Sequence, residues 1–385
     1  MRGRPLLLAA LLLVPAAAMP GEGPAGPAAP AWAIRVVLRQ GAERLTVSAS
    51  SGFTFADPTS GLLLGFYRAY APVTVSALRG GVGVDGRAFA ASTLLVEAVG
   101  GGWVRLEGRP YRGVLRLSRD GGGRLVAVNV LPLEEYVRGV MRAEIASDWP
   151  LEAMRAQAVV ARTYALHAAL TAGEAPYDLT ATTADQVYAG AWGEDSRSDE
   201  AVLSTRGVVL TYEGMIIPAF YHSASGGMTE DAVEAWEKQY PFIVGVSDSF
   251  SGGAPHHLWE ETLPEDVLRR LLAAGGYPVG VIASIEPVTW SRAGRIRRLQ
   301  IRHGAGVLTL EAKVFRQLVG AEVLRSTHFT VLRNGSNFTF VGKGWGHGVG
   351  LSQWGAKAMA DLAFGYGEIL RYYFPLANLH RLPGS

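Results

Sequence analysis

The stretch "RLVAVNVLPLEEYVRGVMRAEI", residues 124–145, changes its hydrophobic pattern half-way along. Before Pro132 it is rich in Val and Leu, as expected of a β-strand. After Pro132 the apolar residues recur at helical spacing, at Leu133, Tyr136, Val137, Val140 and Met141. The stretch therefore predicts a strand that leads directly into an amphipathic helix, and an α+β fold for the chain.

The sequence on either side extends this pattern. Residues 32–130 alternate apolar and polar residues between Gly-rich turns, which predicts an N-terminal β-rich part. Residues 131–375 mix helical and strand patterns and are expected to form a core packed against that part. Within them, residues 251–340 combine an amphipathic helix with alternating strands, as an inserted segment would.

The N-terminus indicates export. Residues 1–19, "MRGRPLLLAALLLVPAAAM", join two Arg to an apolar run from Leu6 to Val14 and then to small residues. The run is far shorter than the roughly 20 residues of a spanning helix. We therefore predict a cleaved signal peptide, so that the chain meets the membrane only transiently. Residues 20–31 are rich in Pro, Ala and Gly and are expected to form a flexible linker.

Composition removes several classes of function. The 385 residues carry a formal net charge of +2, which gives no reason to expect nucleic acid as a partner. The chain has no Cys, so a thiol nucleophile, a disulfide framework and a thiolate zinc site are excluded.

Glu144 is the leading candidate for chemistry. Leu133, Val137, Val140 and Glu144 are spaced by four, three and four residues, so a carboxyl group continues an apolar stripe. It also stands at the expected C-terminus of the helix, where the dipole disfavours negative charge. Burial and dipole both raise a carboxyl pKa, as a general acid requires. The alternative is a structural Glu that pairs with Arg155 or Arg162.

Two further motifs carry polar side chains. The Ala-rich stretch "AQAVVARTYAL", residues 156–166, contains Arg162, which could bind a carboxylate or lie on a solvated surface. The stretch "YHSASGGMTE", residues 221–230, predicts a turn where a polymer could approach the backbone. A Ser nucleophile there is disfavoured, because the sequence does not read G-x-S-x-G.

The stretch "GKGWGHGVGLSQWGAKAMA", residues 342–360, places His347 among glycines and before a helix. It is not a phosphate-binding loop, and His347 has no neighbouring metal ligands in the sequence. Close backbone approach and a turn into the helix explain the glycines better. His347 itself is as easily a structural residue as a functional one.

Taken together and in this order, these stretches resemble the SpoIID/LytB family, named for stage II sporulation protein D and the amidase enhancer LytB. The resemblance covers about residues 32–375. It implies an exported lytic transglycosylase of peptidoglycan, acting in the periplasm or cell wall on glycan strands, with Glu144 as the single acid and base. From their places in these motifs and their side-chain chemistry, we also expect a substrate-binding groove that orients the glycan, formed by Arg162, Tyr164, Gln186, Ser223, Ser225, His347 and Gln353.

The sequence departs from the family at one motif. Some members bind zinc through Cys and His in the stretch that matches "DLTATTADQVY", residues 178–188, where this chain has Thr180, Ala184 and Asp185. We therefore predict no metal and no cofactor. The rival interpretation is a non-catalytic wall-binding protein that enhances a cell-wall amidase, and a wall-anchored scaffold is a third.

Overall fold

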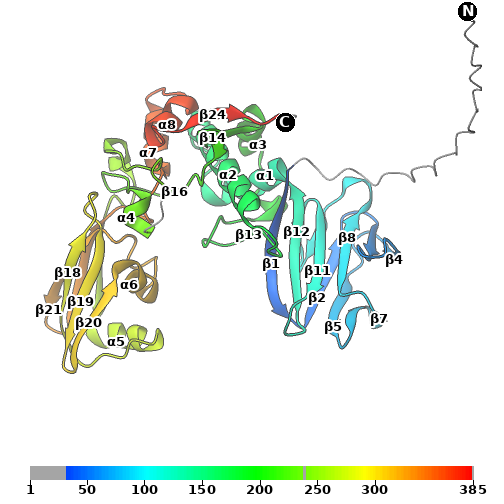
Figure 1. The fold of residues 1–385 in the computed structure, drawn as a ribbon, viewed down its shortest axis with the longest axis horizontal. Helices are drawn as coiled ribbons and strands as arrows, with labels where there is room; N and C mark the ends of the chain where they lie inside the picture. The colour runs from blue at the N-terminus through cyan, green and yellow to red at the C-terminus, as the bar shows by residue number, and fades with distance from the viewer. Residues whose placement is uncertain (1–31, 237–239, 384–385) are drawn as a thin grey trace, which may run out of the picture.

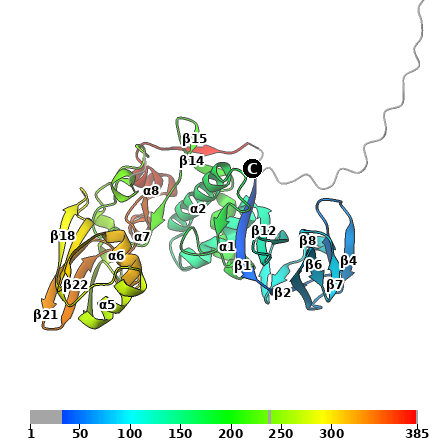
Figure 2. The ribbon, with the colours of Figure 1, turned by 60° about the horizontal axis from the view of Figure 1, so that its bottom comes forward.

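The computed structural model describes residues 32–236 and 240–383. The predicted signal peptide and linker, residues 1–31, lie outside the described residues. Figures 1 and 2 show strand-rich lobes at the two ends of the molecule, with a group of helices between them. The combination confirms the predicted α+β class. No helix in the described part of the chain is both long and apolar enough to cross a membrane.

Two sheets form the N-terminal lobe. The larger has the strand order β13 (Leu179–Thr180), β1 (Ala33–Ala42), β12 (Leu125–Pro132), β11 (Val114–Arg119), β8 (Thr93–Ala98), β3 (Phe53–Ala56) and β4 (Leu63–Tyr67). The smaller has the order β10 (Arg109–Tyr111), β9 (Val104–Leu106), β2 (Arg44–Ala49), β5 (Val73–Leu78), β6 (Gly81–Val84) and β7 (Arg87–Phe89). Alternating side chains of both sheets enter one core.

Helix α1 (Leu133–Glu144) follows β12 without an intervening loop. Its buried stripe includes the five apolar residues of the predicted pattern. The longer helix α2 (Leu151–Thr171) is buried on more than one side, which its Ala and Val content permits. Both helices contribute to the core of the N-terminal lobe. The predicted N-terminal part, residues 32–130, and the predicted core, residues 131–375, thus share one hydrophobic core. The boundary between them at residue 130 stays a prediction.

The other side of α2 packs on a second core. That core is completed by α7 (Gln353–Asp361), α8 (Tyr366–Tyr373) and a small sheet of β15 (Met215–Ile216), β14 (Val208–Tyr212) and β24 (Asn378–Arg381). Helix α3 (Ser196–Ser204) contacts both α1 and α2. Strand β16 (Tyr221–His222) pairs in parallel with β23 (Leu351–Ser352), which brings the glycine-rich loop beside the central helices.

The second strand-rich lobe has a core of its own. One of its sheets contains β17 (Leu258–Pro264), β22 (Asn337–Lys343) and β21 (Phe329–Asn334), and the other contains β18 (Ile282–Trp290), β19 (Ile296–His303) and β20 (Gly306–Glu311). Helices α5 (Glu265–Ala274) and α6 (Ala312–Val319) belong to the same lobe, and the short α4 (Ala232–Trp236) precedes it. Strands β17 and β22 are paired from Leu258 with Lys343 to Pro264 with Asn337.

Candidate functional site

Glu144 is the last residue of α1, and its side chain is partly buried. The backbone N–H of Val187 donates to Glu144 Oε1 at 2.8 Å. The hydroxyl of Tyr221, on β16, also donates to the Glu144 carboxyl group. Neither partner carries a positive charge. The alternative in which Glu144 pairs with an arginine of α2 is wrong, because among the described residues Arg155 pairs with Glu152 and Arg162 with Glu134.

A chain of hydrogen bonds fixes the tyrosine that contacts Glu144. The Tyr136 hydroxyl, from α1, donates to Gln186 Oε1 at 3.0 Å. Gln186 Nε2 in turn donates to the Tyr221 hydroxyl oxygen at 3.2 Å, and the Tyr221 proton is directed to Glu144. Tyr136 and Gln186 are fully buried. The chain therefore orients the carboxyl group through neutral groups alone.

Burial raises the pKa of the Glu144 carboxyl group above its ordinary value of 4.5. The hydrogen bonds from Val187 and Tyr221 act in the opposite direction, because both favour the ionised carboxylate. Burial outweighs them. The C-terminal end of α1 adds an unfavourable dipole for negative charge. Glu144 is therefore a carboxylic acid that keeps its proton to higher pH than an exposed glutamate.

The glycine-rich loop reaches this carboxyl group through the helix that follows it. Gln353, the first residue of α7, donates from Nε2 to the backbone carbonyl of Glu144 at 3.3 Å. The ring of its neighbour Trp354 lies edge-on to that of Trp149, 5.1 Å between centroids. Gln353 is 8% exposed and holds the end of α1. The predicted residue is thus beside Glu144, in contact with its backbone.

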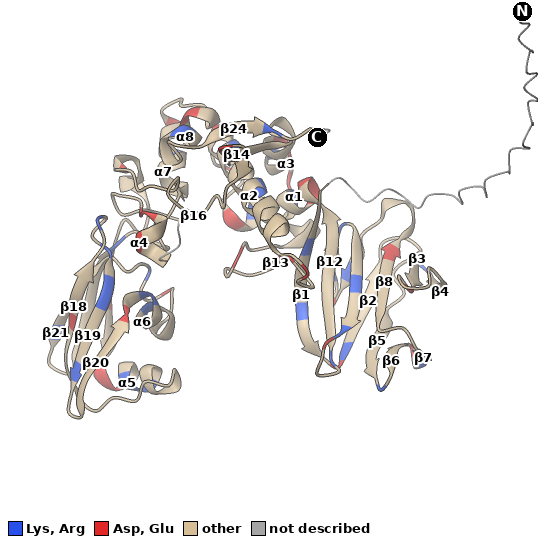
Figure 3. Cartoon of the chain, in the orientation of Figure 1, with Lys and Arg blue, Asp and Glu red and all other residues tan. Residues whose placement is uncertain are grey.

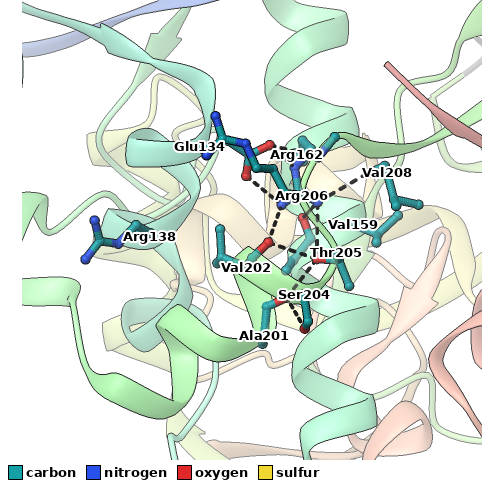
Figure 4. A network of polar contacts seen from close by, with 12 residues as sticks. Glu134, Arg138, Val159, Arg162, Ala201, Val202, Ser204, Thr205, Arg206 and Val208 are labelled. Atoms are coloured by element: carbon teal, nitrogen blue, oxygen red, sulfur yellow. Dashed lines mark hydrogen bonds and ion pairs between the residues drawn. The ribbon is translucent and has the colours of Figure 1, made fainter. Parts of the chain in front are cut away.

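Arg162 does not lie on a substrate-binding surface, contrary to the sequence-based expectation. Its side chain is 0% exposed and donates from Nε and Nη2 to the two carboxylate oxygens of Glu134, at 2.9 and 2.8 Å. The remaining contacts are with neutral oxygens of Val202, Thr205 and Val208 (Figure 4), and with the carbonyl oxygen of Ala158. The reason is that α2 is covered on both sides, so a polar stripe on it faces protein.

Two other predicted glycan contacts are also fully buried. Gln186 is occupied by the two tyrosines described above and so positions Tyr221 instead of touching a ligand. Ser225 donates to Asp248 Oδ2 at 2.6 Å and lies 2.9 Å from the hydroxyl of Ser251. Both expectations of direct substrate contact are therefore corrected to internal roles.

Tyr164 and Ser223 remain partly exposed. The Tyr164 hydroxyl donates to Asp185 Oδ1 at 3.0 Å. The backbone carbonyl of Ser223 accepts from the N–H of Trp354 at 3.0 Å, which places it at the start of α7. Substrate binding by these two residues stays a prediction.

His347 contacts the backbone of Tyr221, whose hydroxyl contacts Glu144. Its Nδ1 accepts from the N–H of Val349 at 3.0 Å, and its ring lies 5.0 Å from that of Trp236. Burial, followed by the charge of Arg295, lowers the pKa of His347 to about 3. The imidazole is therefore neutral. His347 lines a cavity beside the second strand-rich lobe, and Glu144 does not line that cavity.

The glycines of residues 342–350 allow other parts of the protein to lie close to the loop backbone. The sequence indicated close approach to this backbone, and the groups that approach it belong to the chain itself. Gly348 and Gly350 have φ of 88° and 73°, in the left-handed region. A Cβ on Gly348 would lie 2.4 Å from Arg295 Nε, and one on Gly350 would lie 2.1 Å from the carbonyl oxygen of Phe220. Other residues at these positions would displace the chain's own packing.

The stretch that aligns with the zinc ligands of some family members is held together by hydrogen bonds. Asp185 Oδ2 accepts from both the N–H and the hydroxyl of Thr180 at 2.8 Å, while Oδ1 accepts from Tyr164. Ala184 offers no side-chain ligand. These residues do not fit a zinc site, because the one carboxylate among them is already used to close the loop.

Sequence reasoning missed three groups that matter to Glu144. They are the hydroxyls of Tyr221 and Tyr136 and the backbone N–H of Val187. The only sequence signal was that Tyr221 stands at the edge of the "YHSASGGMTE" motif. Tyr136 was expected only as an apolar residue of the α1 stripe, and the position of Val187 depends on the path of the backbone between α2 and β14.

Comparisons with known proteins agree with this architecture. The SpoIID family, described as stage II sporulation protein, matches residues 121–212, from β12 through α1 and α2 to β14. A domain of unknown function (DUF8618) matches residues 238–350, which include the second strand-rich lobe. Stage II sporulation protein D of Bacillus amyloliquefaciens is 32% identical over 267 residues, covering 64% of this chain and 74% of that protein. The chain belongs to the SpoIID family.

Other relatives of this SpoIID-family chain differ in length and name. An uncharacterized protein of Brachyspira hyodysenteriae is 33% identical over 251 residues, or 65% of this chain and 67% of that protein. The amidase enhancer of Bacillus subtilis is 30% identical over 291 residues, or 63% of this chain. The matched region spans only 40% of the amidase enhancer.

Proposed function

We propose that this SpoIID-family protein is an exported lytic transglycosylase that cleaves the β-1,4 bond between MurNAc and GlcNAc in peptidoglycan. The observation that carries the proposal is the environment of Glu144. Its carboxyl group is partly buried at a helix C-terminus, accepts from neutral donors only within the described part of the chain, and has a raised pKa. A general acid needs such an environment to hold its proton near neutral pH.

In this reaction Glu144 donates its proton to the glycosidic oxygen, and the bond from that oxygen to C1 of MurNAc breaks. The resulting carboxylate then takes the proton of the C6 hydroxyl of the same sugar, while O6 bonds to C1 and closes a 1,6-anhydro ring. One carboxyl group therefore serves both steps, and no water is consumed. Ordinary glycosidases need a second carboxylate as base or nucleophile.

The groups around Glu144 support the two protonation states in turn. Burial favours the neutral acid before bond cleavage, and the donors Val187 N–H and Tyr221 hydroxyl stabilise the carboxylate after it. The partly exposed Trp354, next to Gln353, offers an aromatic surface on which a sugar ring could stack. Export, in turn, rests on the N-terminal sequence.

The test compares the wild type with Glu144→Gln, which keeps the shape of the side chain and removes its proton. Each protein is incubated with purified glycan strands, with and without stem peptides, and products are identified by mass. We expect 1,6-anhydro-muramyl ends from the wild type and a loss of about 10²- to 10⁴-fold in the variant. Glu174→Gln, at an exposed glutamate after α2, is the matched control and should retain full activity.

A second function is favoured by the similarity to the amidase enhancer. In that case the chain binds the wall and stimulates an N-acetylmuramoyl-L-alanine amidase without cleaving glycan. The same two proteins are added to an amidase and its substrate. Stimulation by wild type and Glu144→Gln alike, with no anhydro ends from either, would replace the transglycosylase proposal by this one.

A further inference from the structure

A cavity of about 270 Å³ lies where the second strand-rich lobe meets the glycine-rich loop. The loop contributes His347, and α4 contributes Trp236. The lobe contributes Arg295 and Arg298 near the start of β19, and Lys313 and Arg316 on α6. Apart from four residues between 230 and 236, the described lining residues lie within residues 238–350, which match the domain of unknown function.

The described residues that line this cavity carry an excess of positive charge. They include five basic side chains and three acidic ones. Figure 3 shows basic positions on the strands of this lobe and along α6. Two of the acids are already engaged with their own bases, Glu311 with Lys313 at 2.7 Å and Glu234 with Arg297 at 3.8 Å. The third, Glu230, accepts the hydroxyl of Ser291 at 2.5 Å.

Three guanidinium groups in the wall lack a carboxylate partner. Among the described residues, no carboxylate oxygen lies within 4.0 Å of Arg295, Arg298 or Arg316. Arg316 donates to the carbonyls of Leu324 and Arg325, at 2.7 and 2.9 Å. Glu230 and Glu322 compensate Arg295 and Arg316 only from beyond that distance. Partly compensated positive charge at a partly enclosed site is costly unless an anion shares the site.

Arg295 is the most deeply buried of the three, with 3% of its surface exposed. Its Nη1 and Nη2 donate to the carbonyls of Gly346 and Ser225, at 3.2 and 2.8 Å, and its buried Nε has no hydrogen-bond partner among the described residues. Glycine at position 348 leaves the space in which this guanidinium lies against the loop. The hydrogen bonds of this buried cation therefore go to neutral groups, and the Glu230 carboxyl group of the same cavity compensates its charge from beyond ion-pair distance.

Guanidinium groups suit carboxylate and phosphate oxygens, because their planar donors match both in geometry and charge. The cavity also has apolar walls at Trp236 and Ile296, which favour an anion attached to a small organic group. We propose that this cavity is an oxyanion-binding site that takes a carboxylate or phosphate group of a small ligand. The site is distinct from Glu144, so the proposal goes beyond glycan cleavage and does not depend on it.

The test is isothermal titration calorimetry on the purified protein with three probes. Inorganic phosphate tests the phosphate source, and N-acetylalanine tests the carboxylate source. N-acetylalaninamide has nearly the same shape as N-acetylalanine without the charge. We expect one or both anions to bind, the amide not to bind, and affinity to fall as salt is raised.

Variants of exposed wall residues connect any binding to this cavity. Arg298→Gln and Lys313→Gln should each weaken anion binding about 10-fold, since each removes a charged donor. Glu311→Gln should strengthen it several-fold, because it frees the ammonium group that Glu311 now holds at 2.7 Å. Arg302→Gln, on the same strand β19 and 53% exposed at its side chain, is the matched control and should not change affinity.

Binding of N-acetylalanine alone would assign the site to carboxylates, and binding of phosphate alone would assign it to phosphate esters. The proposal fails if neither anion binds, if the amide binds as well as the acid, or if Arg302→Gln weakens binding as much as Arg298→Gln. These readouts involve no cleavage of glycan. The binding results can therefore be interpreted whether or not the protein proves to be a transglycosylase.

Discussion

Two partly buried glutamates, Glu134 in the first turn of α1 and Glu144 in the last, have opposite surroundings. Glu134, in the first turn, accepts a bidentate pair from Arg162 and a hydrogen bond from the N–H of Gly207 at 3.0 Å. Among the described residues, the Glu144 carboxyl group in the last turn accepts only from a backbone N–H and a tyrosine hydroxyl. The helix dipole favours the first carboxylate and disfavours the second.

This difference separates a carboxylate that stabilises the fold from a carboxyl group that is available for chemistry. Glu134 joins α1 to α2 and to the turn before β14, and it balances a fully buried charge. Glu144 balances no charge, so its proton is held by burial and not by partners. Both residues are glutamates on the same helix, so the difference in their roles comes from the groups that surround each side chain.

The largest expected effect comes from the paired end. Glu134→Gln leaves the Arg162 guanidinium buried without a counter-charge, and we expect the free energy of unfolding to fall by about 3–5 kcal/mol. Urea denaturation monitored by circular dichroism measures this. Exposed Glu174→Gln serves as control and should change stability by less than about 0.5 kcal/mol. If Glu134→Gln lowers the free energy of unfolding by less than about 1 kcal/mol, Glu134 does not stabilise the fold in the way proposed and the contrast with Glu144 is wrong.

At the other end of α1, replacing Glu144 should increase the free energy of unfolding at high pH, whereas replacing Glu134 decreases it. Because the pKa of Glu144 is raised in the folded protein, the folded state holds this proton more tightly than the unfolded state. Its contribution to stability is complete below pH 4.5 and is lost as pH rises through the folded pKa. Glu144→Gln should therefore become more stable relative to the wild type as pH rises.

This comparison uses urea denaturation of the two proteins at a series of pH values from about 4 to 8. The difference in unfolding free energy should grow across that range in favour of the variant. A difference that stays constant would mean that folding does not shift the Glu144 pKa, and one that grows in favour of the wild type would mean that the carboxylate is stabilised. Either result would contradict the raised pKa on which the proposed role as an acid depends.

The smallest expected effect comes from the tyrosine that contacts Glu144. Tyr221→Phe removes a hydrogen bond that favours the carboxylate, so the pKa of Glu144 should rise further. The pH above which glycan cleavage declines should move up by roughly half a unit to one unit, the worth of one hydrogen bond. Tyr70→Phe, exposed in the N-terminal lobe, is the control. An unchanged or downward-shifted profile would show that the hydroxyl does not act on Glu144.

Much of this organisation was predictable from local pattern. The period change at Pro132 predicted the junction of β12 and α1, and the apolar stripe predicted that Glu144 would be drawn into the protein. The glycines before α7 predicted close backbone approach. Each of these rests on residues near one another in sequence, where spacing fixes geometry.

The failures concern residues whose roles depend on distant partners. Arg162 and Gln186 have polar side chains in motifs of the right kind, yet both are fully buried. Whether a polar stripe faces solvent or a neighbouring element depends on tertiary packing, and the partners Glu134 and Tyr221 lie 28 and 35 residues away. The charge of the cavity at Arg295 likewise arises from several elements that meet only in the folded chain.

The attachment of the second strand-rich lobe has a consequence for how such a chain could be built. Strand β17, where the backbone enters the lobe, pairs with β22, where it leaves, so that Leu258 at the entry lies directly opposite Lys343 at the exit. Neighbouring strands are only about 5 Å apart. A short hairpin could bridge the same two positions, so a module with its own core can be gained, lost or exchanged here without stretching the helices that hold Glu144.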